Sequence, residues 1–207
     1  MDVIGVIQYD MGNIRSVVNA LEYLSVPVKI ISRPQDVSAV GKIILPGVGA
    51  FGEAMAKLRE KNMIEALDLE VRKKGKFFLG ICLGMQLICR NSCEFGDFSG
   101  LGWLDAGVRR LPDAPGISVP HVGWNNLIIR KSGRLIRTPE NRDGPEAYFV
   151  HSYYVDASGA DFVAATCEHG VEFAAMIEQD NIFATQFHPE KSQSTGLEIL
   201  ENFAQLR

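Results

Sequence analysis

The sequence predicts an α/β fold, with a mostly parallel central sheet flanked by helices and antiparallel strands added in the C-terminal half. In the first half, short apolar runs alternate with segments of helical periodicity, which is typical of a parallel sheet covered on both faces. In the second half, strand-like runs follow one another closely, with a hairpin signal at Asp180-Asn181. A chain of 207 residues is large enough for one α/β core, so residues 1–207 are expected to form a single domain.

Apolar runs and their periodicity predict the individual elements. Strands are expected at 3–9, 28–31, 42–45, 77–81, 108–111, 124–129, 148–155, 162–167, 173–178 and 182–187. Helices are expected after residue 13, from residue 32, over a long segment carrying Ile64, Leu67 and Val71, and directly after Cys82. A closing helix is expected to begin at a capping box, Thr195-Gly196-Leu197-Glu198.

The composition excludes several classes of protein. Hydrophobic residues make up 46% of the chain and charged residues 22%, as in ordinary globular proteins. The net charge of −4 offers nothing to attract nucleic acid or an anionic membrane surface. No run is long enough to span a membrane, and Met1-Asp2-Val3 lacks the basic start of a signal peptide, so a cytoplasmic location is expected.

The four cysteines predict neither a disulfide nor a metal site. None of them forms a C-x-x-C pair, and no histidine lies at zinc-ligand spacing from them. Cys82, Cys89 and Cys93 could share one face of a helix, but core packing accounts for Cys89 better than a metal does.

The segment Gly80-Ile81-Cys82-Leu83-Gly84 has the G-x-C-x-G form of a nucleophile elbow, in which a strand turns sharply into a helix. Its glycines fit a place where strand and helix pass close together. Backbone N–H groups at a helix N-terminus stabilise a thiolate, and the N–H of Leu83 can face a developing oxyanion. The alternative is a buried, inert cysteine, so a second motif is needed to decide.

That motif is Gln186-Phe187-His188-Pro189-Glu190, at the end of the last expected strand. The proline favours an extended backbone at His188, and along extended chain Glu190 points to the same side. The carboxylate can hold one imidazole nitrogen and leave the other free to act as a base toward Cys82. The two motifs together favour a Cys82–His188–Glu190 catalytic triad over a structural histidine.

A glycine-rich loop, Pro46 to Gly52, follows the third expected strand and fits neither phosphate-binding pattern. It is either a tight turn or a loop that supplies a second oxyanion donor, from the N–H of Val48 or Gly49. We favour the second alternative because an elbow is already present.

The motifs at 80–86 and 186–190 resemble those of triad-type (class I) glutamine amidotransferases, which cleave the side-chain amide of glutamine and pass ammonia to a synthase. The resemblance implies the class I glutamine amidotransferase fold and no cofactor. Four further segments resemble the glutaminase subunits of imidazole glycerol phosphate synthases, so that the resemblance covers essentially the whole chain: 9–13, 45–52, 120–125 and 148–154.

By motif, the resemblance implies that Gln86, Glu94, Ser152 and Tyr153 contact glutamine. It also implies a heterodimer with a (β/α)₈-barrel cyclase subunit, which would use the ammonia to make imidazole glycerol phosphate and AICAR in histidine biosynthesis. The residues expected at that interface are Asn13, His121, Trp124, Asn125 and Tyr148. One departure is Cys93-Glu94, where the family commonly has two adjacent acids.

Three alternatives remain open at this point. The first is a paralogue that supplies ammonia for amidination of surface-polysaccharide sugars. The sequences of the segments Glu94-Phe95-Gly96 and Gly100 to Trp103 resemble such paralogues as well. Cys–His–acid sets serve cysteine peptidases as well, although matches outside the triad count against a peptidase. A non-catalytic partner-binding module is the third, and the presence of all three triad residues disfavours it.

Overall fold

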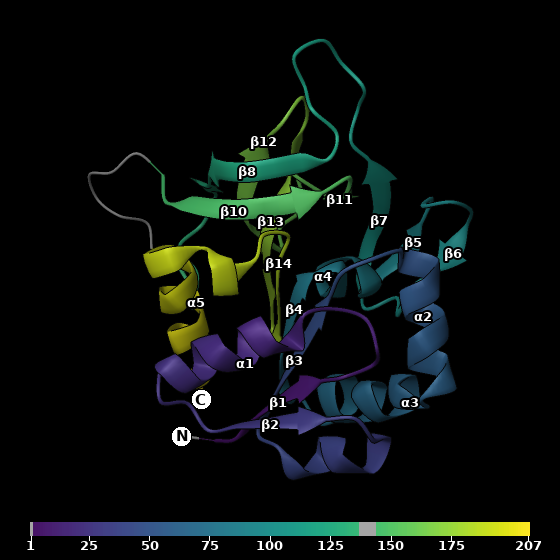
Figure 1. Cartoon of the computed structure of the whole chain (residues 1–207), viewed down its shortest axis with the longest axis vertical. Helices are drawn as coiled ribbons and strands as arrows, with labels where there is room; N and C mark the ends of the chain where they lie inside the picture. Colours follow the sequence, from purple (N-terminus) through teal and green to yellow (C-terminus); the bar gives the residue numbers. More distant parts are fainter. Residues whose placement is uncertain (1, 137–143) are drawn as a thin grey trace.

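The computed structural model describes residues 2–136 and 144–207. Within them, the centre is an eight-stranded sheet in the order β2-β1-β3-β4-β14-β13-β12-β9 (Figure 1). The first five run parallel: β2 (Val28–Ile31), β1 (Ile4–Ile7), β3 (Lys42–Gly47), β4 (Phe77–Cys82) and β14 (Ile182–Thr185). The last three are antiparallel: β13 (Glu172–Gln179), β12 (Val163–Glu168) and β9 (Ile128–Ile129). This confirms the predicted α/β fold.

Two smaller sheets complete the strand content of the described residues. One pairs β8 (His121–Asn126) with β10 (Glu146–His151), and it lies across the upper ends of β4 and β14 in Figure 1. The other contains β11 (Tyr153–Asp156), β7 (Leu104–Arg110), β5 (Cys89–Ser92) and β6 (Phe98–Ser99). Loops at the carboxyl ends of the parallel strands therefore face strands from the C-terminal half.

Helices cover both faces of the central sheet (Figure 1). On one side lie α1 (Ile14–Tyr23) and α5 (Gln193–Gln205), and on the other lie α2 (Phe51–Glu60) and α3 (Met63–Leu67). Successive side chains of β3 point to opposite faces of the sheet and so enter two different hydrophobic clusters. Ile43 and Leu45 pack in the cluster that includes α2, and Ile44 packs in the cluster that includes α1. None of the helices in the described part of the chain is long and apolar enough to cross a membrane.

Three helix predictions are wrong in detail. The expected long helix is shorter at its start, because Asn62 adopts a left-handed conformation (φ 55°) between α2 and α3; Ile64, Leu67 and Val71 lie on α3 and on the π-helical turns Asp68–Lys73 that continue it. The helix after Cys82, α4 (Leu83–Leu87), is only five residues long, and β5 begins at Cys89, so the cysteines share no helical face. The closing helix begins at Gln193, before the expected capping box, because Ser192 already ends the preceding turn.

Two predicted strands are each divided in two. The segment 148–155 bends at Ser152, so that β10 and β11 enter different sheets. The segment 124–129 begins earlier, at His121, and Leu127 separates β8 from β9. Periodicity alone does not show these breaks, because the apolar pattern continues through the bend.

Candidate active site

Cys82 lies on a strained turn between β4 and α4. It is the last residue of β4, and its backbone has φ 54° and ψ −107°, a conformation that costs a non-glycine residue free energy. The flanking glycines are needed for space, because a Cβ on Gly84 would collide with the carbonyl oxygen of Leu45 and one on Gly80 with that of Gly84. The side chain of Cys82 is 6% exposed. The sharp turn from strand to helix that was predicted at Cys82 is thus present.

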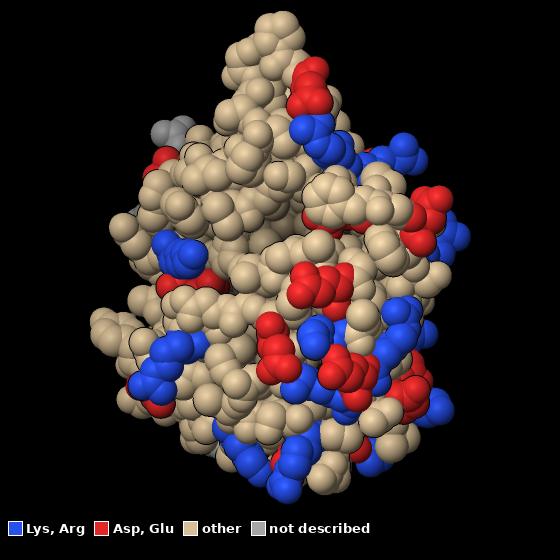
Figure 2. Space-filling view, turned by 45° about the vertical axis from the view of Figure 1, so that its right-hand side comes forward, with Lys and Arg blue, Asp and Glu red and all other residues tan. Residues whose placement is uncertain are grey.

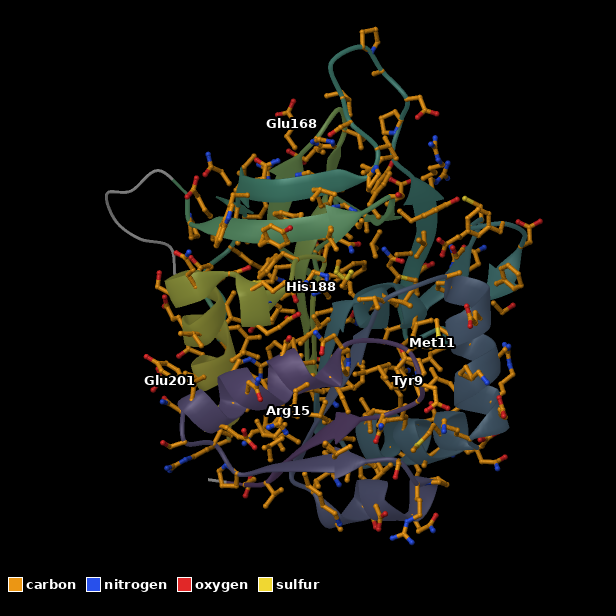
Figure 3. The ribbon with its side chains drawn as sticks, viewed as in Figure 1. Tyr9, Met11, Arg15, Glu168, His188 and Glu201 are labelled. Carbon is orange, nitrogen blue, oxygen red and sulfur yellow. The ribbon has the colours of Figure 1, made fainter. Side chains whose placement is uncertain are left out.

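His188 lies outside the strands, and hydrogen bonds to its backbone fix its position. The structure ends β14 at Thr185, so the predicted position of His188 at the strand's end is wrong. Its N–H donates to the carbonyl of Tyr148 in β10 at 3.0 Å, and the hydroxyl of Ser192 donates to its carbonyl at 2.7 Å. In Figure 3, His188 lies below the β8–β10 ribbon.

His188 and Glu190 form a buried pair, with Nδ1 of the imidazole 2.8 Å from Oε1 of the carboxylate and both side chains 4% exposed. The predicted contact is present, but the predicted reason is wrong: Pro189–Lys191 is a 3-10 turn, which carries Glu190 back toward His188. Burial alone lowers the pKa of His188, but the neighbouring Cys82 and Glu190 outweigh it and raise the pKa to about 10. Nε2 of His188 has no partner within the described residues.

A cleft of about 270 Å³ opens at Cys82. It is large enough for a small polar substrate rather than a drug-sized ligand. All of the residues predicted from the sequence as oxyanion donors and glutamine contacts line it: Val48, Gly49, Leu83, Gln86, Glu94, Ser152 and Tyr153. The structure therefore brings these seven positions together around Cys82.

The sheet register explains why the glycine-rich loop reaches this cleft. Gly47, the last residue of β3, pairs with Cys82 across the parallel ladder. Val48 and Gly49 follow directly. Gly49 has φ 106°, a backbone conformation that residues other than glycine rarely adopt. The loop thus begins beside the nucleophile elbow, as an oxyanion loop would require.

Two of the predicted glutamine contacts also hold the protein together. The Nε2 of Gln86 donates to the carbonyl of Tyr153 at 2.8 Å and to Oε1 of Gln186 at 3.1 Å. Oε2 of Glu94 accepts the N–H of Phe51 at 2.6 Å, at the N-terminus of α2. Burial raises the pKa of Glu94, and this hydrogen bond counteracts the rise in part.

Sequence reasoning missed two buried polar groups beside Cys82. Nε2 of Gln186 lies 3.8 Å from the sulfur of Cys82. The only feature of the sequence that could have indicated this contact is that Gln186 lies two residues before His188. The hydroxyl of Tyr9 lies next to Gly47 and has no hydrogen-bond partner in the described structure. Tyr9 is labelled on the β1–α1 connection in Figure 3; it begins the segment 9–13 that resembles the family, but nothing in that segment indicated that the hydroxyl would lie beside the elbow.

The residues predicted to face a partner differ in exposure. Trp124 is 45% exposed and packs edge-on against Tyr148 across the β8–β10 pair, with ring centroids 5.9 Å apart. Asn13 is exposed, and Asn125 is half-buried. His121 is 4% exposed and stacks on Phe149, so the structure contradicts its prediction as a contact residue on this surface. Side chains of a strand alternate between its two faces, so His121 points inward while Val122 and Trp124 of the same strand point outward.

Charge is distributed unevenly over one face of the molecule. Figure 2 shows basic and acidic side chains gathered over its lower part, while the upper part is mostly uncharged and hollowed. No group of three His, Cys, Asp or Glu side chains in the described ranges could hold a metal ion. All four cysteines are free.

The fold and the cleft define a class of protein. A family model described as glutamine amidotransferase class-I matches residues 6–206. The solved structure of PurLQS from Thermotoga maritima aligns over 98% of both chains with a TM-score of 0.73 at 19% identity, which shows a shared fold. The chain belongs to the class-I glutamine amidotransferase family.

Two relatives are much more similar. The protein named imidazole glycerol phosphate synthase subunit HisH in Moorella thermoacetica is 46% identical over 203 residues, which cover 98% of this chain and 94% of that relative. A protein of the same name in Geobacter sulfurreducens is 44% identical over the full length of both. Within the class, the chain therefore belongs with the HisH subunits.

Proposed function

We propose that this chain is the glutaminase subunit of an imidazole glycerol phosphate synthase, which hydrolyses L-glutamine to glutamate and ammonia. The observation that carries the proposal is the strained Cys82 in the lining of a small cleft, with the buried His188–Glu190 pair as its neighbour. The similarity to HisH subunits over essentially the whole chain supports it. None of the relatives reported above favours a surface-polysaccharide pathway or a peptidase.

In the first step, the Cys82 thiolate attacks the side-chain carbonyl carbon of glutamine. The carbon–sulfur bond forms, and negative charge moves to the oxygen, where the N–H groups of Leu83 and of Val48 or Gly49 stabilise it. As the oxyanion collapses, His188 gives its proton to the leaving nitrogen and ammonia departs. The raised pKa of His188 supports this role, because it keeps the imidazole protonated beside the thiolate.

In the second step, neutral His188 takes a proton from water, and the resulting hydroxide attacks the thioester. Glutamate leaves, Cys82 returns to the thiolate, and His188 is again protonated. Glu190 bonds Nδ1 throughout, which fixes the tautomer that directs Nε2 toward the reaction. No cofactor takes part in this scheme.

The cleft residues are assigned from their remaining hydrogen-bonding capacity. Both amide hydrogens of Gln86 are engaged by Tyr153 and Gln186, so its oxygen is left for the substrate amide. Glu94 lines the cleft and offers a carboxylate for the α-ammonium group of glutamine. Ser152 and Tyr153 line the same cleft, where we place the other contacts with the amino-acid portion.

We further propose that residues 1–207 act as one domain, in the cytoplasm, in a heterodimer with a (β/α)₈-barrel cyclase subunit. The ammonia would pass within the complex to the barrel, for synthesis of imidazole glycerol phosphate and AICAR in histidine biosynthesis. Support comes from the word "subunit" in the names of the relatives, and from the contact between the exposed Trp124 and the half-buried Tyr148, because aromatic side chains are common in protein interfaces.

The nucleophile is tested with a matched pair of cysteine variants. Cys82→Ala should abolish glutamate release while the melting temperature changes little. Cys89→Ala is the control: burial raises the pKa of Cys89 to about 12, so it stays a neutral core residue, and its variant should remain active at a modest cost in packing. Glutamine hydrolysis that survives in Cys82→Ala would remove Cys82 from this role.

The partner is tested by measuring glutamate release from the chain alone, with the barrel subunit, and with the barrel subunit and its substrate. Partner-driven stimulation should fall in Trp124→Ala, with no change in the basal rate. Tyr23→Ala, which removes another exposed aromatic residue from the end of α1, should be stimulated normally. If all three conditions gave equal rates, the partner would only receive ammonia and would not activate the site.

A further inference from the structure

Gln186 reaches Cys82 because of the register between neighbouring parallel strands. Thr185, the last residue of β14, pairs with Ile81 of β4. The next residue along the chain is Gln186 on one side and Cys82 on the other. Side chains at equivalent positions of adjacent strands lie near one another. Gln186 has no exposed surface, and its Nε2 is 3.8 Å from the sulfur of Cys82.

The hydrogen-bond network determines which end of the Gln186 amide faces the sulfur. The carbonyl of Tyr153 can only accept, so the group of Gln86 that lies 2.8 Å from it must be the donating NH₂. The same nitrogen lies 3.1 Å from Gln186, which must therefore present its oxygen to Gln86. That leaves the NH₂ of Gln186 directed at Cys82.

A second contact shows why a donor is useful at this position. The sulfur of Cys82 also lies 3.9 Å from the carbonyl of Val150, to which a neutral thiol can donate. A thiolate has no hydrogen to donate to that carbonyl, so it needs a donor from another group. An N–H directed at the sulfur stabilises the thiolate more than the thiol, because hydrogen bonds to charged groups are the stronger ones.

We propose that Gln186 is a positioning residue whose amide, oriented by Gln86 and the Tyr153 carbonyl, donates a hydrogen bond to the sulfur of Cys82 and favours its thiolate form. The proposal rests on the proposed glutaminase function only in taking Cys82 as the nucleophile. Gln186 does not line the cleft, so it acts on the reacting sulfur and leaves glutamine binding to other residues.

The test measures thiolate reactivity directly, without glutamine. The full-length chain is treated with iodoacetamide at a series of pH values, and labelling of Cys82 is followed by mass spectrometry of its peptide. Gln186→Leu, which removes the donor at similar volume, should move the labelling profile toward alkaline pH and slow labelling about tenfold near neutral pH. Gln186→Glu should slow it further, because a carboxylate then faces the sulfur.

Thr185→Val is the matched control, because it removes a neighbouring buried polar group whose hydroxyl instead donates to the carbonyl of Phe187. Its profile should match that of the wild type, even if its melting temperature falls. In glutamine hydrolysis, Gln186→Leu should lower kcat and leave KM unchanged. An unshifted labelling profile for a folded Gln186→Leu variant would overturn the proposal and leave the glutaminase assignment intact.

If Gln186→Leu does not fold, Gln86→Leu carries the test. It leaves Gln186 in place and removes the group that orients its amide, so the labelling profile should shift in the same direction by a smaller amount. The proposed contact of Gln86 with glutamine does not enter this measurement, because no glutamine is present. An unchanged profile in this variant would mean that the amide orientation has no effect on the sulfur. Wild-type chain that does not hydrolyse glutamine, with or without a barrel subunit, would instead contradict the proposed function.

Discussion

Gly47→Ala should destabilise the protein because the site of its Cβ is already occupied. The new methyl group would collide with the hydroxyl oxygen of Tyr9 and would lie 3.1 Å from Cβ of Leu83. Inserting one carbon into a well-packed interior costs about 1–3 kcal/mol. Both neighbours are anchored, Leu83 at the start of α4 and Tyr9 with no exposed surface, so little relaxation is expected.

Tyr9→Phe should remove most of that cost. The Tyr9 hydroxyl is buried without a hydrogen-bond partner in the described residues, and burial keeps it neutral by raising its pKa. Deleting an unsatisfied buried hydroxyl is neutral or stabilising, since leaving one costs about 1–3 kcal/mol. In the Tyr9→Phe background the collision with oxygen is gone, and only the contact with Leu83 remains.

The measurement is a double-mutant cycle by urea unfolding, monitored by circular dichroism at neutral pH. The interaction free energy between the two substitutions should be about 1–2 kcal/mol, within the usual range for residues in contact. Glutaminase turnover should follow the same pattern, because Gly47 pairs with Cys82 in the sheet. Strictly additive free energies would show that Tyr9 can move away and would refute the reasoning.

Three further predictions concern the surrounding groups. Gly49→Val forces a β-branched residue to φ 106° and should lower kcat by about 10²–10³, the typical effect of one lost oxyanion donor, with a much smaller change in KM. Glu94→Ala leaves the N–H of Phe51 unpaired and should lower the free energy of unfolding by about 1–3 kcal/mol in urea, whereas Glu94→Gln should cost less. Burial lowers the pKa of His151 to about 3 and that of His121 to about 4, both below the unfolded value of about 6.5. Their contribution to stability is therefore fully present above pH 6.5 and is lost as the pH falls through 4 to 3; unfolding free energies that are equal at pH 7 and pH 5 would contradict it.

The elements that the sequence predicted well depend on local chemistry. A strand that ends in Gly80-Ile81-Cys82-Leu83-Gly84 can turn into a helix only if its neighbours are small, and the structure shows why at Gly84. Apolar runs were sufficient to place the parallel strands, and the turn residues Asp180-Asn181 predicted the hairpin between β13 and β14. Breaks such as that at Asn62 were missed, because one residue of unusual conformation leaves the apolar pattern around it intact.

Only the tertiary structure decided which distant residues surround Cys82. The sequence by itself predicted the elbow and the contact between His188 and Glu190, since each is contained within a few consecutive residues, although a 3-10 turn and not extended chain makes that contact. It could not place Gly47 and Gln186 on either side of Cys82, because strand order and register arise from packing of whole elements around a shared core. Whether a buried amide donates or accepts likewise depends on partners far away in the chain, such as the carbonyl of Tyr153.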